Sequence, residues 1–92
     1  MEFKELQKII KNKYYKIDKK SGDLFLLAVL FEEVGELAEA VRKRDKEKIK
    51  EELSDVIFMS LSISNYFGIN NLEEYILKKY IKNDPSKKWD LR

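Results

Sequence analysis

The sequence has no cysteine and no histidine among its 92 residues. Without cysteine, the chain has no disulfide, no thiolate zinc site and no cysteine nucleophile. Without histidine, it has no Ser-His-Asp triad, no histidine general base and no Glu-x-x-His ligands of the kind found in di-iron bundles. Carboxylate, Lys, Arg, Tyr, Ser and Asn side chains remain for chemistry. A site built from carboxylates alone suits a hard cation, Mg²⁺ or Mn²⁺, better than zinc or copper.

Long apolar runs and a large excess of charge are also missing. No apolar run is long enough to span a membrane, and the first ten residues lack the shape of a signal peptide, so we expect a cytoplasmic location. Charged residues make up 39% of the chain, yet the net charge is only +2, which argues against a dedicated nucleic-acid binder. The length predicts a single domain, 1–92, with little room for a second core.

Apolar residues recur at helical spacing, and no segment alternates as a strand would. The fold class predicted is all-α, a four-helix bundle. The predicted helices and the tail span about 2–15, 24–43, 46–67, 72–83 and 84–92.

Residues at the predicted boundaries have capping character. Asp23 and Asp45 are predicted N-caps of the second and third helices. Gly68 marks the end of the third helix, because glycine readily adopts the left-handed conformation found there. Asn71 is predicted to cap the fourth helix, and Pro85 stops it.

The second predicted helix is apolar almost all the way round, except at its glutamates. One helix of a four-helix monomer rarely finds enough partners to cover every side. We therefore predict a homodimer or homotetramer, most simply a two-fold dimer that packs the second and third helices across its interface. The alternative is a central helix in a compact monomeric bundle.

Two acidic pairs, each with three-residue spacing, lie on the second and third helices. They are Glu33 with Glu36, and Glu52 with Asp55. The members of a pair lie one turn apart on the same helix face. Two such pairs on facing helices would supply four carboxylates for one or more cations, and Mg²⁺ held this way also binds substrate phosphates. The pattern therefore indicates Mg²⁺-dependent phosphoryl chemistry.

The apolar surroundings of these carboxylates strengthen that interpretation. Counting about 100° per residue places Glu36 between Phe25 and Val29, and the other three also lie among apolar neighbours. Burying an unpaired charge costs several kcal/mol or more, so four converging carboxylates would require a cation. The alternative is a set of exposed carboxylates that pair with nearby lysines such as Lys48.

The sequence EEVGELAEA at 32–40, followed by EELSDV at 51–56, resembles the MazG nucleotide pyrophosphohydrolases. That family carries the signature EExxE, then a gap, then ExxD, and both halves match without a break. The resemblance implies a four-helix all-α core and Mg²⁺ dependence. It also implies hydrolysis of a ribo- or deoxyribonucleoside triphosphate to its monophosphate and pyrophosphate, as a house-cleaning activity on the nucleotide pool.

The resemblance also implies roles for individual residues. By motif position, Glu33, Glu36, Glu52 and Asp55 would hold the metal, and Glu32 is a further catalytic candidate. A water activated by the metal or by a carboxylate would attack the α-phosphorus, with pyrophosphate leaving.

Three residues near the C-terminus are candidates for substrate binding. The fourth helix of the family carries a Lys and, four residues on, an Asn near the phosphates, and Lys79 and Asn83 match this spacing. The alternative for Lys79 is a side chain that snorkels from an apolar stripe. Trp89 would stack on a base, or else pack as an ordinary tail tryptophan.

Two other hypotheses fit the same sequence. One is phosphoribosyl-ATP pyrophosphohydrolase of histidine biosynthesis, which has a similar size, fold and acidic pairs. The other is a non-catalytic helical oligomerisation module, in which the acidic pairs form only salt bridges between helices. Dependence on Mg²⁺ separates the enzymes from the module.

Overall fold

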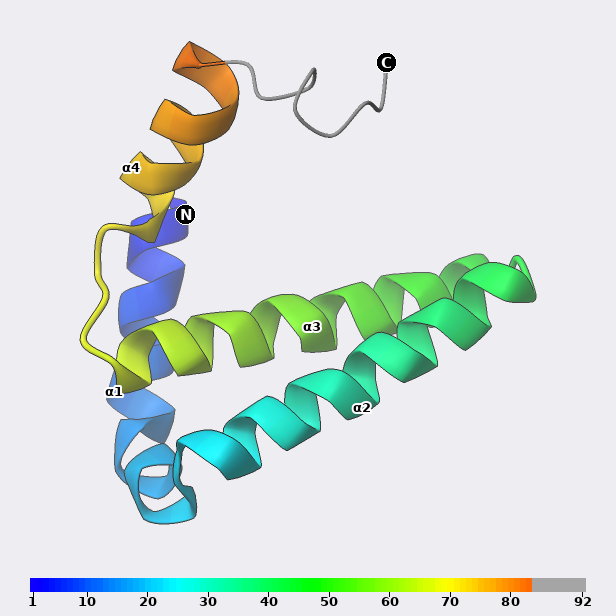
Figure 1. Cartoon of the computed structure of the whole chain (residues 1–92), viewed down its shortest axis with the longest axis horizontal. Helices are drawn as coiled ribbons and strands as arrows, with labels where there is room; N and C mark the ends of the chain where they lie inside the picture. Colours follow the sequence, from blue (N-terminus) through cyan, green and yellow to red (C-terminus); the bar gives the residue numbers. More distant parts are fainter. Residues whose placement is uncertain (84–92) are drawn as a thin grey trace.

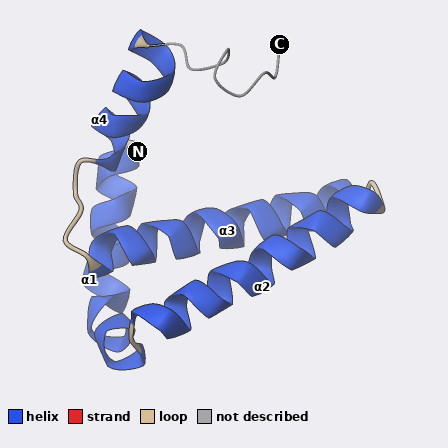
Figure 2. Cartoon of the chain, in the orientation of Figure 1, coloured by secondary structure: helices blue, strands red, loops and turns tan. Residues whose placement is uncertain are grey.

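A computed structural model describes residues 1–83, which form helices joined by short connections (Figure 1). No strand occurs in this described part, as Figure 2 shows, so the predicted all-α class is confirmed. The elements are α1 Phe3–Ser21, α2 Asp23–Arg42, α3 Lys46–Tyr66, α4 Leu72–Ile76 and η1 Leu77–Lys82, the last being a π-helical continuation of α4.

The long helices α2 and α3 lie side by side as an antiparallel hairpin, and α1 crosses the end at which α3 finishes (Figure 1). Arg44 has a positive φ of 59° in the tight connection between α2 and α3. Asp45 then caps α3 by accepting a hydrogen bond from the backbone N–H of Lys48 at 3.2 Å, which confirms the predicted cap. At the other end Gly68 has φ +69°, and α3 stops where the sequence predicts.

The core of the described chain is small and lies between α2 and α3 and where α1 packs against them. Tyr14 of α1 packs edge-on against Phe58 of α3, with 5.0 Å between the ring centroids. The buried apolar residues are Ile10, Leu26, Ala40, Met59 and Leu61.

The first helix is longer than the sequence predicts. It continues to Ser21, because the residues after Tyr15 include three lysines, which are good helix formers, and no helix breaker before Gly22. Gly22, with φ +92°, ends the helix. The predicted N-cap role of Asp23 is wrong, because Asp23 is the first residue of α2 and Gly22 occupies the capping position.

The fourth helix extends away from the hairpin (Figure 1). Asn71 occupies its N-cap position, but the side chain makes no capping hydrogen bond. Within the described residues, only α1, α2 and α3 form the packed core of a single chain. Several large apolar side chains of the fourth helix are consequently exposed: Tyr75, Ile76, Leu77 and Ile81.

The second helix also leaves apolar surface uncovered. Leu24, Phe25 and Phe31 are 76%, 57% and 65% exposed. The sequence places apolar residues on nearly every side of α2, and within residues 1–83 α3 covers one of those sides. None of the helices in residues 1–83 combines the length and apolar character that crossing a bilayer requires.

Candidate metal centre

The two acidic pairs face each other across the α2–α3 hairpin. Glu33, Glu36 and Glu52 each offer a carboxylate oxygen, and these atoms lie within 4.8 Å of one another. In a second group, one carboxylate oxygen from each residue again lies within 4.8 Å of the others, and its members are Glu51, Glu52 and Asp55. Glu52 belongs to both groups, so it is the centre of the acidic cluster that the hairpin assembles. Antiparallel packing brings the pairs together because each lies the same few turns from the α2–α3 connection.

Burial differs sharply within this cluster. Glu52 is only 1% exposed, whereas Glu33 and Asp55 are partly buried and Glu36 is exposed. The expectation of apolar surroundings therefore holds for Glu52 and fails for Glu36. The apolar neighbours expected around Glu36 include Phe25, which is itself exposed because this face of α2 has no partner within the described chain.

Two carboxylate oxygens in the cluster are buried without a hydrogen-bond donor among residues 1–83. They are Oε2 of Glu33 and Oε2 of Glu52. A buried ionised carboxylate that lacks a donor is costly, so it requires either a proton or a cation. Carboxylate oxygens of this kind are the ligands that Mg²⁺ and Mn²⁺ prefer. The residues present therefore fit a hard divalent cation.

The electrostatics of the cluster agree with this geometry. The pKa of Glu33 is raised to about 7, first by hydrogen bonding to Glu52, then by desolvation and by the neighbouring Asp55 and Glu36. The pKa of Glu36 is also raised, mainly by its interactions with Glu52. Carboxyl groups this close to one another resist simultaneous ionisation. In the absence of metal, Glu33 consequently keeps its proton up to about neutral pH, and a cation would displace that proton.

One cation of the chain lies beside the buried carboxylate. Lys48 Nζ lies 3.6 Å from Oε1 of Glu52 and 3.7 Å from Oε2 of Glu51. These carboxylates raise the pKa of Lys48, with Glu51 as the largest cause. From the sequence, Lys48 is expected only as a partner of exposed carboxylates. Its spacing four residues before Glu52 is the signal that could have identified it.

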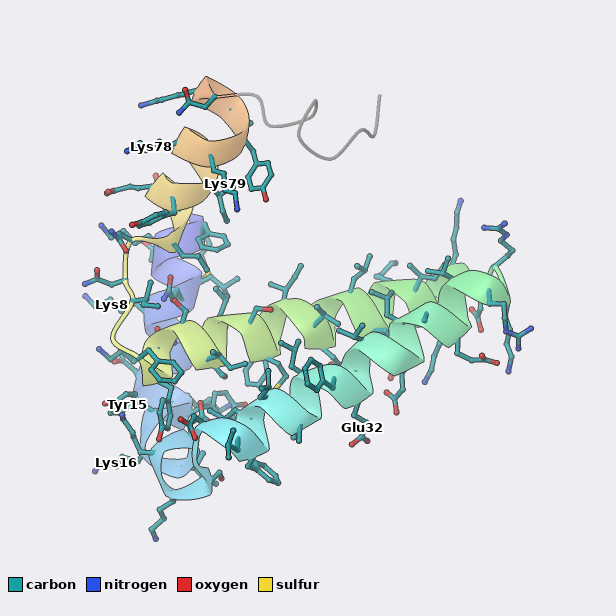
Figure 3. All side chains as sticks on the ribbon, in the orientation of Figure 1. Lys8, Tyr15, Lys16, Glu32, Lys78 and Lys79 are labelled. Atoms are coloured by element: carbon teal, nitrogen blue, oxygen red, sulfur yellow. The ribbon has the colours of Figure 1, made fainter. Side chains whose placement is uncertain are left out.

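The other sequence-predicted site residues lie outside the cluster. Glu32 is exposed and points away from α3 in the view of Figure 3. Lys79 and Asn83 lie on and just after the π-helical end of the fourth helix, which extends away from the hairpin (Figures 1 and 3). The side chain of Asn83 donates to the carbonyl of Lys78 at 3.1 Å. Trp89 lies outside the described residues.

A comparison with protein families agrees with the acidic motif. The family model described as the MazG nucleotide pyrophosphohydrolase domain matches residues 21–87. A search of curated proteins found no match. The matched segment contains the whole α2–α3 hairpin and both acidic pairs. Because the match covers well over half of the 92 residues, the chain belongs to the MazG nucleotide pyrophosphohydrolase family.

Proposed function

We propose that this chain is a Mg²⁺-dependent pyrophosphohydrolase that converts a ribo- or deoxyribonucleoside triphosphate to its monophosphate and pyrophosphate. The observation that carries the proposal is the pair of buried carboxylate oxygens on Glu33 and Glu52 that have no donor within residues 1–83. A purely structural salt-bridge network would pair such oxygens, whereas a metal site leaves them open when the metal is absent.

The Mg²⁺ ion would be held by four carboxylates, and Mn²⁺ could take its place. These carboxylates are Glu33, Glu36, Glu52 and Asp55. When bound, Mg²⁺ would neutralise phosphate charge and lower the pKa of a water molecule. Glu52 is fixed by burial and would anchor the site, while the exposed Glu36 faces the solvent from which water and substrate arrive.

The reaction we propose is a single displacement at phosphorus. The water oxygen forms a bond to the α-phosphorus, and the bond from that phosphorus to the oxygen bridging to the β-phosphate breaks. Pyrophosphate leaves with the bonding electrons. A carboxylate of the cluster accepts the proton that the water loses, and the nucleoside monophosphate remains.

We further propose that a second copy of the chain covers α2. The exposed Phe25 and Phe31 give this helix an uncovered apolar face, which a two-fold dimer would bury. Lys79 and Asn83 lie on and just after η1, in the segment that extends away from the α2–α3 hairpin of their own chain (Figure 1). In an oligomer of this kind, they would meet the triphosphate bound at a cluster contributed by another copy. House-cleaning of the cytoplasmic nucleotide pool is the role we propose for this activity.

A panel of ribo- and deoxynucleoside triphosphates, incubated with Mg²⁺ or with EDTA, tests the proposal. We expect equal amounts of monophosphate and pyrophosphate, no free phosphate, and no reaction in EDTA. Phosphoribosyl-ATP belongs in the same panel. Turnover of that compound alone would replace the proposed substrate class. If none of these compounds is hydrolysed, the enzymatic proposal is wrong and a non-catalytic helical module takes its place.

A further inference from the structure

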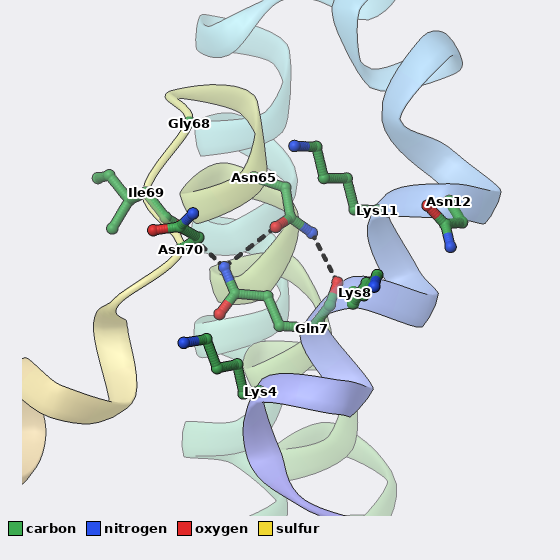
Figure 4. Close-up of a pocket in the computed structure, with 9 residues that line it drawn as sticks. All are labelled: Lys4, Gln7, Lys8, Lys11, Asn12, Asn65, Gly68, Ile69 and Asn70. Atoms are coloured by element: carbon green, nitrogen blue, oxygen red, sulfur yellow. Dashed lines mark hydrogen bonds between the residues drawn. The ribbon is translucent and has the colours of Figure 1, made fainter.

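A cavity lies at the opposite end of the hairpin from the acidic cluster. It has a volume of about 330 Å³ and lies between the first half of α1 and the connection that follows α3 (Figure 4). Asn65 lines it, and Asn65 is ten residues beyond Asp55 on the same helix, about 15 Å along its axis. The cavity is therefore separate from the candidate metal centre.

The charge around this cavity has one sign. Lys4, Lys8 and Lys11 line it from a single face of α1, at spacings of four and three residues. No acidic residue of the described chain lines it. Among residues 1–83, none of the three ammonium groups takes part in an ion pair. An anion between these lysines would be attracted by all three, and Nζ of Lys11 also lies 5.5 Å from the centroid of the Tyr15 ring.

Neutral amide groups accompany the lysines. Asn12, Asn65 and Asn70 line the same cavity. The Nδ2 group of Asn65 donates to the backbone carbonyl of Gln7 at 3.2 Å, and no described acceptor takes its second hydrogen. Amide N–H groups and ammonium groups together are donors suited to phosphate oxygens.

Hydrogen bonds between buried side chains hold the floor of the cavity together. Gln7 and Asn65 are each 4% exposed. Gln7 Nε2 donates to Asn65 Oδ1 at 3.0 Å and to the backbone carbonyl of Ile69 at 2.7 Å. These bonds join α1, α3 and the connection after α3 (Figure 4). The lysines therefore project from a hydrogen-bonded framework, with Lys4 and Lys11 on the two sides of the Gln7–Asn65 pair in Figure 4.

We propose that this cavity, which we call the α1 basic pocket (Lys4, Lys8, Lys11, Asn65 and Asn70), binds a small phosphate anion. The ligand class is a free pyrophosphate or the phosphate tail of a nucleotide. A cavity of about 330 Å³ lies at the small end of the range for ligand pockets, which suits such an anion. The proposal is independent of the catalytic function proposed above, because it uses none of the carboxylates.

Titration of the full-length, ¹⁵N-labelled protein with inorganic pyrophosphate in excess EDTA tests the proposal. EDTA removes metal from the acidic cluster, so binding there cannot mimic binding at the α1 basic pocket. We expect saturable binding with a dissociation constant of about 1 mM or below, because three charge-assisted contacts would form. The side-chain amide signals of Asn65 and Asn70 should shift. Absence of saturable binding for pyrophosphate, AMP and ATP would overturn the proposal.

A pair of charge-matched variants separates this pocket from general charge attraction. The triple variant Lys4→Gln, Lys8→Gln, Lys11→Gln should weaken pyrophosphate binding about tenfold or more. Its control removes the same charge from positions outside the cavity lining, as the triple variant Lys13→Gln, Lys16→Gln, Lys20→Gln, and should change binding less than about twofold. Circular dichroism checks that both variants fold. Equal losses in the two variants would overturn the proposal.

Three ligands distinguish the sources of the anion. Tighter binding of ATP than of pyrophosphate at the α1 basic pocket would identify a nucleotide as the ligand, whereas equal binding would identify free pyrophosphate. A short oligodeoxythymidylate is the third ligand. If it binds more tightly than both and the two triple variants weaken it equally, α1 is a nucleic-acid surface and the small-anion proposal fails.

Discussion

Lys48 Nζ lies 3.6 Å from Oε1 of Glu52, a carboxylate that is 1% exposed at the centre of the acidic cluster. Lys48 itself is half exposed. The ammonium group therefore forms an ion pair with one oxygen of the buried carboxylate from the solvent side. The other oxygen, Oε2, has no donor within residues 1–83. A divalent cation at the cluster would thus meet a competing positive charge at Glu52.

The variant Lys48→Gln should bind Mg²⁺ about two- to fivefold more tightly at pH 8.5, because a half-exposed ion pair contributes up to about 1 kcal/mol. Isothermal titration with Mg²⁺ at that pH measures the change while the carboxylates are ionised. Lys50→Gln is the matched control, since Lys50 pairs with the exposed Glu47 at 3.6 Å. Weaker binding by Lys48→Gln would show that Lys48 organises the site and does not compete with the cation.

The variant Glu52→Gln should lose Mg²⁺ binding and reduce pyrophosphate release by about 100-fold or more, because Glu52 is the carboxylate common to both acidic groups. The same change removes a buried charge that lacks a donor at one oxygen, so the thermal midpoint in EDTA should stay equal or rise. Glu47→Gln, on the exposed side of α3, is the control. A large fall in the midpoint together with lost activity would instead indicate a structural role for Glu52.

The stability of the metal-free protein should respond to pH through Glu33. Its pKa is raised from 4.5 to about 7, so the folded chain binds this proton more tightly than the unfolded chain does. The resulting stabilisation is present below about pH 4.5 and is lost as pH rises through about 7. Compared with Glu33→Gln, the wild type should therefore lose thermal stability between pH 5 and pH 8 in EDTA. Mg²⁺ at pH 8 should restore it, and differential scanning calorimetry measures each midpoint. Parallel curves for the two proteins would contradict the shifted pKa.

The variant Phe31→Glu should weaken self-association about tenfold or more, because Phe31 is 65% exposed on the uncovered face of α2. Sedimentation velocity across a concentration series measures the shift toward the 11.0 kDa monomer. Ile17→Glu places the same charge at an exposed apolar position of α1 and serves as the control. A wild type that sediments as a monomer at every concentration would refute the proposed dimer.

The variant Lys79→Ala should raise KM for the nucleotide about tenfold with little change in kcat, because a lost charge-assisted hydrogen bond to phosphate weakens ground-state and transition-state binding alike. Lys78→Ala removes an identical charge from the neighbouring position and is the control (Figure 3). Steady-state kinetics in Mg²⁺ separates the two constants. Equal effects of the two variants would show that Lys79 contributes only to the general positive charge and makes no specific contact with phosphate.

Local physics explains the features that could be predicted from the sequence. The limits of α3 follow from a capping carboxylate at Asp45 and a left-handed glycine at Gly68, and both depend on residues within a turn of the boundary. The acidic pairs could also be predicted from local spacing, since residues three apart on a helix place their side chains on one face. The lysine-rich segment after Tyr15 predicts a loop, but α1 continues through it to Ser21, because lysine favours a helix as well as solvent.

Residue spacing and capping chemistry along the chain specify that it is helical, where its two central helices run, and which carboxylates share a helix face. The burial of Glu52 and the exposure of Glu36 follow from the packing of the helices, because burial depends on which face of α2 meets α3. The α1 basic pocket also required the fold. Gln7 and Asn65 are 58 residues apart and meet only because α1 crosses the end of α3. Helix spacing fixes neighbours within a turn, whereas contacts over such separations follow from how whole helices pack.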